Sequence, residues 1–94
     1  MEATMKIDEA LRIMSGYDWH WCMADYGYTQ FYEGAKATMR RFVKVVSEIE
    51  NSAIREALRN LWTLKYENAR AQRNGNEMAD FEEREAELMN VINS

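Results

Sequence analysis

The chain contains no proline and only four glycines among its 94 residues, and this scarcity of helix breakers constrains its fold most strongly. Proline breaks the interior of a helix, and glycine weakens it by about 1 kcal/mol relative to alanine. The glycines stand at Gly16, Gly27, Gly34 and Gly75. Long helices separated by brief turns are therefore expected. The sequence predicts an all-α fold, a small bundle of three or four helices.

Apolar residues recur at helical spacing in four segments, which predicts helices over residues 6–14, 29–50, 52–73 and 77–92. The residues that form these stripes are, in chain order, Ile7, Ala10, Leu11 and Met14; Phe31, Ala35, Phe42, Val46 and Ile49, widened by Met39, Val43 and Val45; Ile54, Ala57, Leu58, Leu61 and Leu64; and Met78, Phe81, Leu88 and Ile92. A short turn at residues 74–76 predicts that the last two helices form a C-terminal antiparallel hairpin. Asn51 separates the middle two, either as a tight corner or as a kink.

The length predicts a single helical domain over residues 1–94, because two cores would each be too small to fold without metals or disulfides. No apolar run approaches the roughly 20 residues that span a bilayer, so no membrane association is expected. Residues 1–7 include Glu2 and Lys6 and lack the apolar stretch of a secretory signal. Cys22 is the only cysteine, which favours a reducing compartment. These features predict a cytoplasmic protein.

Residues 17–28 read YDWHWCMADYGY and hold five of the eleven aromatic residues. Alternation of Tyr17, Trp19 and Trp21 fits a strand, whereas Trp19 and Tyr26 fit a short helix over about 18–26. The helix is favoured, because no second strand is predicted that would pair with the first. Packed inside, the rings would close the core; exposed, they would form a contact surface.

Asp18, His20, Cys22 and Asp25 are the only clustered residues that are typical of metal binding or catalysis. On a helix His20 lies off the face that the others share, and on a strand Asp25 does. One histidine and one cysteine cannot supply the paired nitrogen and sulfur ligands of a zinc site. A buried cysteine and a histidine among aromatic rings is the commoner situation. The sequence therefore predicts no enzyme, no metal site and no cofactor.

The leading functional hypothesis is a non-catalytic protein–protein interaction domain: an adaptor, an inhibitor or a self-associating module. Tryptophan and tyrosine are enriched at binding hot spots, and so much aromatic area is difficult to bury in 94 residues. The partner is expected to be another protein, with a second copy of the chain as one option. The residues expected to bind this partner are Trp19, Trp21, Tyr26, Tyr28 and Tyr32.

An alternative hypothesis is nucleic-acid binding through the third predicted helix. One face of this helix carries arginines interleaved with two rings, which suits phosphates and stackable bases: Arg55, Arg59, Trp62, Tyr66, Arg70 and Arg73. Lys36, Arg40 and Lys44, one turn apart on the second helix, would add to this site. In the simpler interpretation the rings seal the edge of the core and the arginine stems cover them. The net charge of −4 favours this interpretation, because most nucleic-acid binders are basic.

Charge is segregated along the chain. Residues 35–75 hold nine bases and four acids, whereas residues 76–94 hold six acids and one base. The acidic end is expected to fold against the basic middle, with acids of the last helix beside Lys65, Arg70 and Arg73: Asp80, Glu82, Glu83 and Glu87. A second alternative is that residues 82–88, EEREAEL, mimic a polyanion and inhibit a nucleic-acid enzyme, as small phage-type inhibitors do.

Overall fold

The computed structural model describes the backbone of residues 2–17, 19 and 29–94 and the side chains of residues 5–17, 19, 36–72 and 74–94. The described part contains four helices and no strand: α1 (Glu2–Ser15), α2 (Thr29–Ser47), α3 (Ser52–Arg73) and α4 (Phe81–Ile92). The all-α prediction is confirmed. The short helix considered over residues 18–26 falls, apart from Trp19, outside the described residues.

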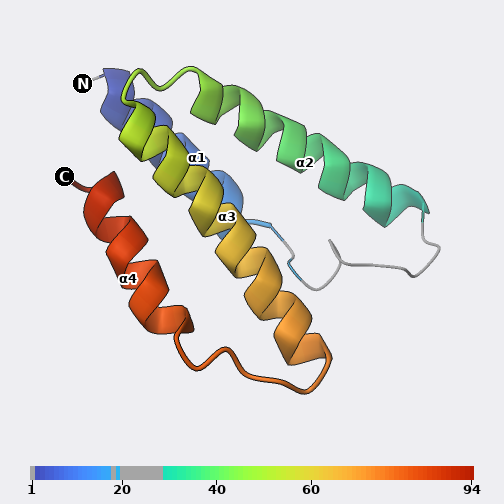
Figure 1. Ribbon diagram of the computed structural model, residues 1–94. Helices are drawn as coiled ribbons and strands as arrows, with labels where there is room; N and C mark the ends of the chain where they lie inside the picture. Colours follow the sequence, from blue (N-terminus) through green and yellow to red (C-terminus); the bar gives the residue numbers. More distant parts are fainter. Residues whose placement is uncertain (1, 18, 20–28) are drawn as a thin grey trace.

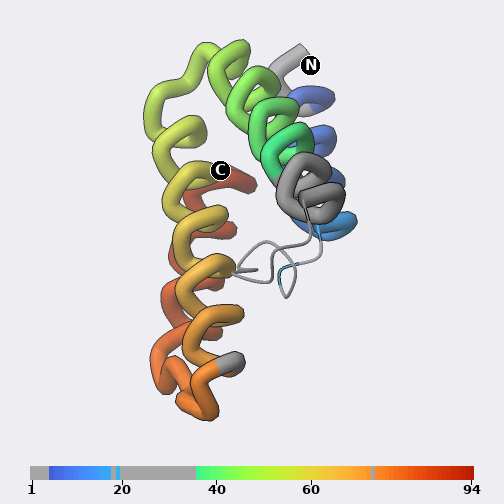
Figure 2. The backbone as a smooth tube through the Cα atoms, turned by 90° about the vertical axis from the view of Figure 1, so that its right-hand side faces the viewer, coloured from blue at the N-terminus to red at the C-terminus, as the bar shows by residue number. Residues whose placement is uncertain are grey.

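The four helices form two hairpins that meet at the α2–α3 corner. Helix α4 returns antiparallel along α3, and α1 lies against α2 (Figure 1). Figure 2 shows α3 with α4 on one side of the molecule and α1 with α2 on the other. In both views the end of α2 lies close to the start of α3, and the two helices diverge away from this junction. The predicted C-terminal hairpin is therefore present.

The core lies where the two hairpins meet. Ala10 and Met14 of α1, Phe42 and Val46 of α2, and Leu58 of α3 are each at most 2% exposed. Ile92 joins the same cluster from α4, and Ile7 and Leu11 pack against it while remaining half-buried. All five apolar residues predicted for the third helix are buried: Ile54, Ala57, Leu58, Leu61 and Leu64. Among the described residues, no helix is both long enough and apolar enough to cross a membrane.

Two residues predicted to widen the core stripe of α2 are instead exposed. The side chains of Met39 and Val43 are 48% and 51% exposed, whereas Val45 is buried. Successive residues of a helix are rotated by about 100°, so Val43 points well away from the adjacent buried Phe42. Val45, Val46 and Ile49 already fill the side that faces the core. The prediction was therefore wrong for Met39 and Val43.

Asn51 forms a corner rather than a kink. Helix α2 ends at Ser47, three residues before its predicted end. The side chain Oδ1 of Asn51 accepts a hydrogen bond from the backbone N–H of Ile54 at 3.1 Å, which caps α3. From the first turn of α3, Nη1 of Arg55 donates to the carbonyl oxygens of Ile49 at 2.6 Å and Glu50 at 3.0 Å. Residues 48–51, the linker between α2 and α3, are therefore hydrogen-bonded directly to the helix that follows them.

Helix α4 begins at Phe81, four residues later than predicted. The connection is thus longer than the expected turn at residues 74–76, and Gly75 within it has a φ of +77°, a conformation that favours glycine. The backbone N–H of Phe81 donates to the carbonyl of Met78 at 3.1 Å, closing a turn just before the helix. Asp80 occupies the N-cap position, and the acids Glu82 and Glu83 follow in the first turn. Negative charge at this end of a helix is favourable, which helps to fix the start there.

Candidate functional site

Four rings from three parts of the chain form one aromatic cluster: Tyr17, Trp19, Phe42 and Trp62. The ring centroids of Tyr17, Trp19 and Trp62 lie 4.7 to 4.8 Å from one another in edge-on or tilted arrangements. Trp62 is also stacked on Phe42 at 4.6 Å. Such pairs are each worth about 0.5 to 1.5 kcal/mol beyond the area they bury. The aromatic cluster therefore holds the segment after α1 against α2 and α3.

Trp19, one of the predicted partner-binding residues, belongs largely to this packing. Its ring is half-buried against the core, and its Nε1 donates to the carbonyl of Met14 at 3.3 Å. Only part of the indole is left for contact with a partner. Trp21, Tyr26 and Tyr28 lie outside the described residues, as does the side chain of Tyr32, whose backbone is in α2.

The exposed part of Trp19 borders a cleft of about 450 Å³ between α3 and the start of α4. Tyr17 and Phe81 contribute further rings to its lining, and Asn68 and Gln72 contribute amides. Lys65 also lines it, with its amino group bound to Glu85 at 3.1 Å. Among its described lining residues the cleft therefore has aromatic walls but no pair suited to acid–base chemistry.

The predicted arginine face of α3 divides into packed and exposed residues. Arg55 bonds the linker carbonyls, and Trp62 is half-buried in the aromatic cluster. Arg59 and Arg70 are exposed and form no ion pair with the described residues, and Tyr66 between them is 36% exposed. The side chain of Arg73 lies outside the described part. Among the described residues, part of this face therefore packs against the core and the linker, and part remains open.

Helix α2 presents a second open surface, of which the sequence predicted the cations but not the apolar residues. Met39 and Val43 lie one turn apart and form an exposed apolar row. Arg40 and Lys44, each the next residue along, form a parallel row of exposed cations. Neither cation lies within ion-pair distance of an acid in the described part of the chain. We call Met39, Arg40, Val43 and Lys44 the α2 face; Lys36, also exposed, precedes Arg40 by one turn.

The acids of α4 remain mostly unpaired. The expected pairing of the last helix with Lys65 occurs, but through Glu85, a half-buried residue on the inner side of α4. Asp80 approaches only Arg84 of its own helix, at 4.0 Å. Glu82, Glu83 and Glu87 are exposed and form no ion pair among the described residues. The inner side of α4 already faces α3, so the acids on its outer side form no ion pair with Lys65 or Arg70.

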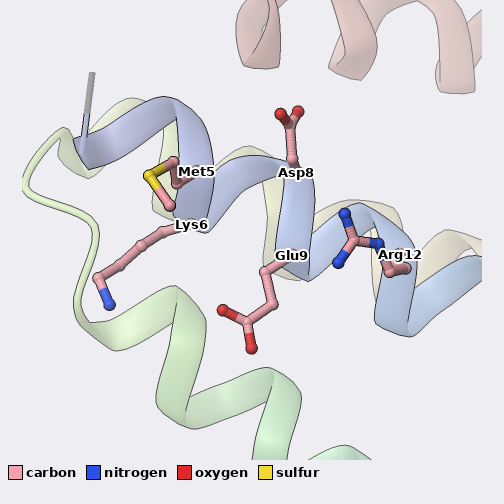
Figure 3. Close-up of a pocket in the computed structure, with 5 residues that line it drawn as sticks. All are labelled: Met5, Lys6, Asp8, Glu9 and Arg12. Carbon is pink, nitrogen blue, oxygen red and sulfur yellow. The ribbon is translucent and has the colours of Figure 1, made fainter.

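The ion pair between Lys6 and Glu48 joins α1 to the end of α2. The hydrogen bond and the positive charge of Lys6 hold the pKa of Glu48 below its ordinary value, and Lys44 adds a smaller effect in the same direction. Figure 3 shows the shallow hollow on α1 next to this pair, with Lys6 and Glu9 extending on the side of α2 and Asp8 on the opposite side. These side chains do not converge on a common point, so the hollow does not resemble a catalytic site.

The cluster of Asp18, His20, Cys22 and Asp25 considered for chemistry lies outside the described residues. No protein-family model matches this chain, and comparison with curated proteins and with solved structures finds no significant match. The exposed surfaces of α2 and α3 are thus the candidate binding sites in the described part of the chain.

Proposed function

We propose that this protein is a non-catalytic interaction domain that binds another protein through the α2 face. The observation that carries the proposal is the exposed apolar row of Met39 and Val43, whose side chains are both close to half exposed on α2. Adjacent apolar side chains that the core does not need are typical of helix-docking surfaces. Arg40 and Lys44 beside them supply charge that selects the partner.

A double substitution tests this proposal. Met39→Ser with Val43→Ser should weaken binding by about tenfold or more, because each apolar side chain buried in an interface contributes roughly 1.5 to 3 kcal/mol. The partner is first captured from cells that make the protein, then purified, and its affinity is measured by calorimetry. Met5→Ser is the matched control, since Met5 is a 74% exposed methionine on α1. Equal affinity of the double variant and the wild type would refute the assignment.

Nucleic-acid binding through α3 is the second candidate. It is supported by Arg59, Tyr66 and Arg70, which are exposed on one face without ion pairs in the described part. Binding of this kind weakens steeply with salt, in proportion to the phosphates contacted. Arg59→Gln with Arg70→Gln should reduce that salt dependence by about two phosphates, whereas Arg12→Gln on α1 should not. Absence of any gel shift at low salt would remove this candidate.

We place the protein in the cytoplasm as part of the same proposal, on the basis of its single cysteine. Fractionation of the native cells tests this location, and recovery in an exported fraction would contradict it.

A further inference from the structure

Two of the exposed faces in the described part of the chain, one on α2 and one on α4, are complementary in charge. On α2, apolar Met39 and Val43 run beside cationic Arg40 and Lys44, with a spacing of four residues in each row. On α4, Glu83, Glu87 and Val91 also recur every four residues. Val91 is 40% exposed, and both acids are exposed. We call Glu83, Glu87 and Val91 the α4 face.

The two faces cannot satisfy each other within one molecule. Helix α4 packs on α3, and α2 pairs with α1 on the other side of the molecule (Figure 2). The ion pair between α3 and α4 uses Lys65 and Glu85, neither of which belongs to either face. No other described residue covers either face, so both are open within the described part of the chain.

We propose that the partner of the α2 face is the α4 face of a second copy of this chain. This inference rests on the proposed function and names its partner. Arg40 and Lys44 lie against Glu87 and Glu83 of the other copy in antiparallel order, and Met39 packs beside Val91, which lies one turn beyond Glu87. In coiled coils, too, charged residues beside the apolar contacts set which helices pair and in which orientation.

Reciprocal pairing gives a closed dimer. When α2 of each copy binds α4 of the other, the same contacts form twice about a two-fold axis, as in most homodimers. The pairing uses two faces of each copy, which doubles the buried area relative to a single helix contact. A specific dimer usually buries roughly 800 Å² on each partner.

Charge reversal tests the pairing by size measurement in the analytical ultracentrifuge. The wild type is expected to sediment as a dimer at low ionic strength and to dissociate as salt screens the ion pairs. Arg40→Glu with Lys44→Glu, or Glu83→Lys with Glu87→Lys, should weaken the dimer by about 100-fold or more, because like charges then oppose each other twice. Mixing the two double variants should restore a dimer, since both contacts of the mixed pair again join opposite charges.

Matched controls separate this pairing from a general effect of net charge. Glu56→Lys with Glu67→Lys changes the charge as much as the α4 variant does, at exposed sites on α3. Arg59→Glu with Arg70→Glu, also on α3, changes the net charge as much as Arg40→Glu with Lys44→Glu on α2. Both controls should remain dimeric, and circular dichroism should show unchanged helix content in all four variants.

A wild-type chain that stays monomeric at all concentrations would overturn the inference, and so would a dimer that the α4 variant leaves intact. Neither result contradicts the proposed function, which is tested separately by the effect of Met39→Ser with Val43→Ser on the affinity for a purified foreign partner. A third outcome is that the wild type is monomeric and binds phosphatidylserine vesicles, and that only the α2 variant loses this binding. The α2 face would then bind an anionic membrane instead of a second copy.

Discussion

Trp62 and Tyr66 lie one turn apart on α3, but they have different surroundings. Trp62 contacts three other rings, whereas Tyr66 is exposed beside Arg59 and Arg70. We expect Trp62→Ala to lower the free energy of unfolding by about 3 kcal/mol, the low end for aromatic truncation because the ring is half-buried. Tyr66→Ala should change it by less than about 0.5 kcal/mol. Urea denaturation of both variants checks this, and similar losses would contradict the aromatic cluster.

The ion pair between Lys6 and Glu48 predicts a pH dependence. Because the pKa of Glu48 is lowered in the folded protein, mainly by the hydrogen bond from Lys6, the pair stabilises the fold above the pKa of the unfolded chain. This contribution is lost as the pH falls through the lowered pKa. In Lys6→Gln the pKa of Glu48, followed by NMR, should rise, and the stability difference from the wild type should vanish in acid. An unchanged pKa would show that the pair does not form in solution.

At the scale of single residues, periodicity predicts which side chains share a face but not which neighbour covers them. It grouped Arg55 and Trp62 with Arg59 and allowed that the rings seal the edge of the core, but it did not predict that Arg55 donates to the linker carbonyls. It placed Met39 and Val43 in the core, because an apolar stripe does not reveal where the neighbouring helices stop.

At the scale of helices, α3 begins at Ser52 and ends at Arg73 as predicted, because Asn51 is a strong cap and the Asn74-Gly75 sequence favours a turn. The start of α1, the end of α2 and the start of α4 were misplaced by four, three and four residues respectively. Glu48 and Ile49 have helix-compatible side chains, and so has Glu77. Whether these residues are helical depends on tertiary contacts, such as the hydrogen bond from Arg55 to the carbonyl of Glu50, and helix propensity does not take such contacts into account.

The cap of α3 can be tested directly. Asn51→Ala removes the acceptor for the N–H of Ile54 and should destabilise the protein by about 1 kcal/mol, whereas Asn51→Asp keeps an acceptor and should cost little. Thermal unfolding followed by circular dichroism measures both. A loss of equal size in the two variants would mean that the side chain acts through something other than the cap.

At the scale of the whole molecule, the core is concentrated where the hairpins meet. Beyond Leu64, Ala69 is the only described residue of α3 that is buried, and the connection to α4 follows. Regions with few buried contacts open at lower free energy. Amide hydrogen exchange should therefore be slowest at Leu58 and Leu61 and markedly faster at Gln72. Uniform protection along α3 would show that the far end of the hairpin is held by contacts outside the described residues.

The bonds from Arg55 to the two linker carbonyls have a consequence for how the chain folds. The donor comes from the helix that follows, so the junction cannot reach its final form until the first turn of α3 exists. During synthesis, the direction in which the chain leaves α2 is therefore fixed only after the first turn of α3 has been made. The α1–α2 hairpin therefore completes its folding only together with the start of α3. We expect a fragment that stops at residue 50 to be incompletely ordered.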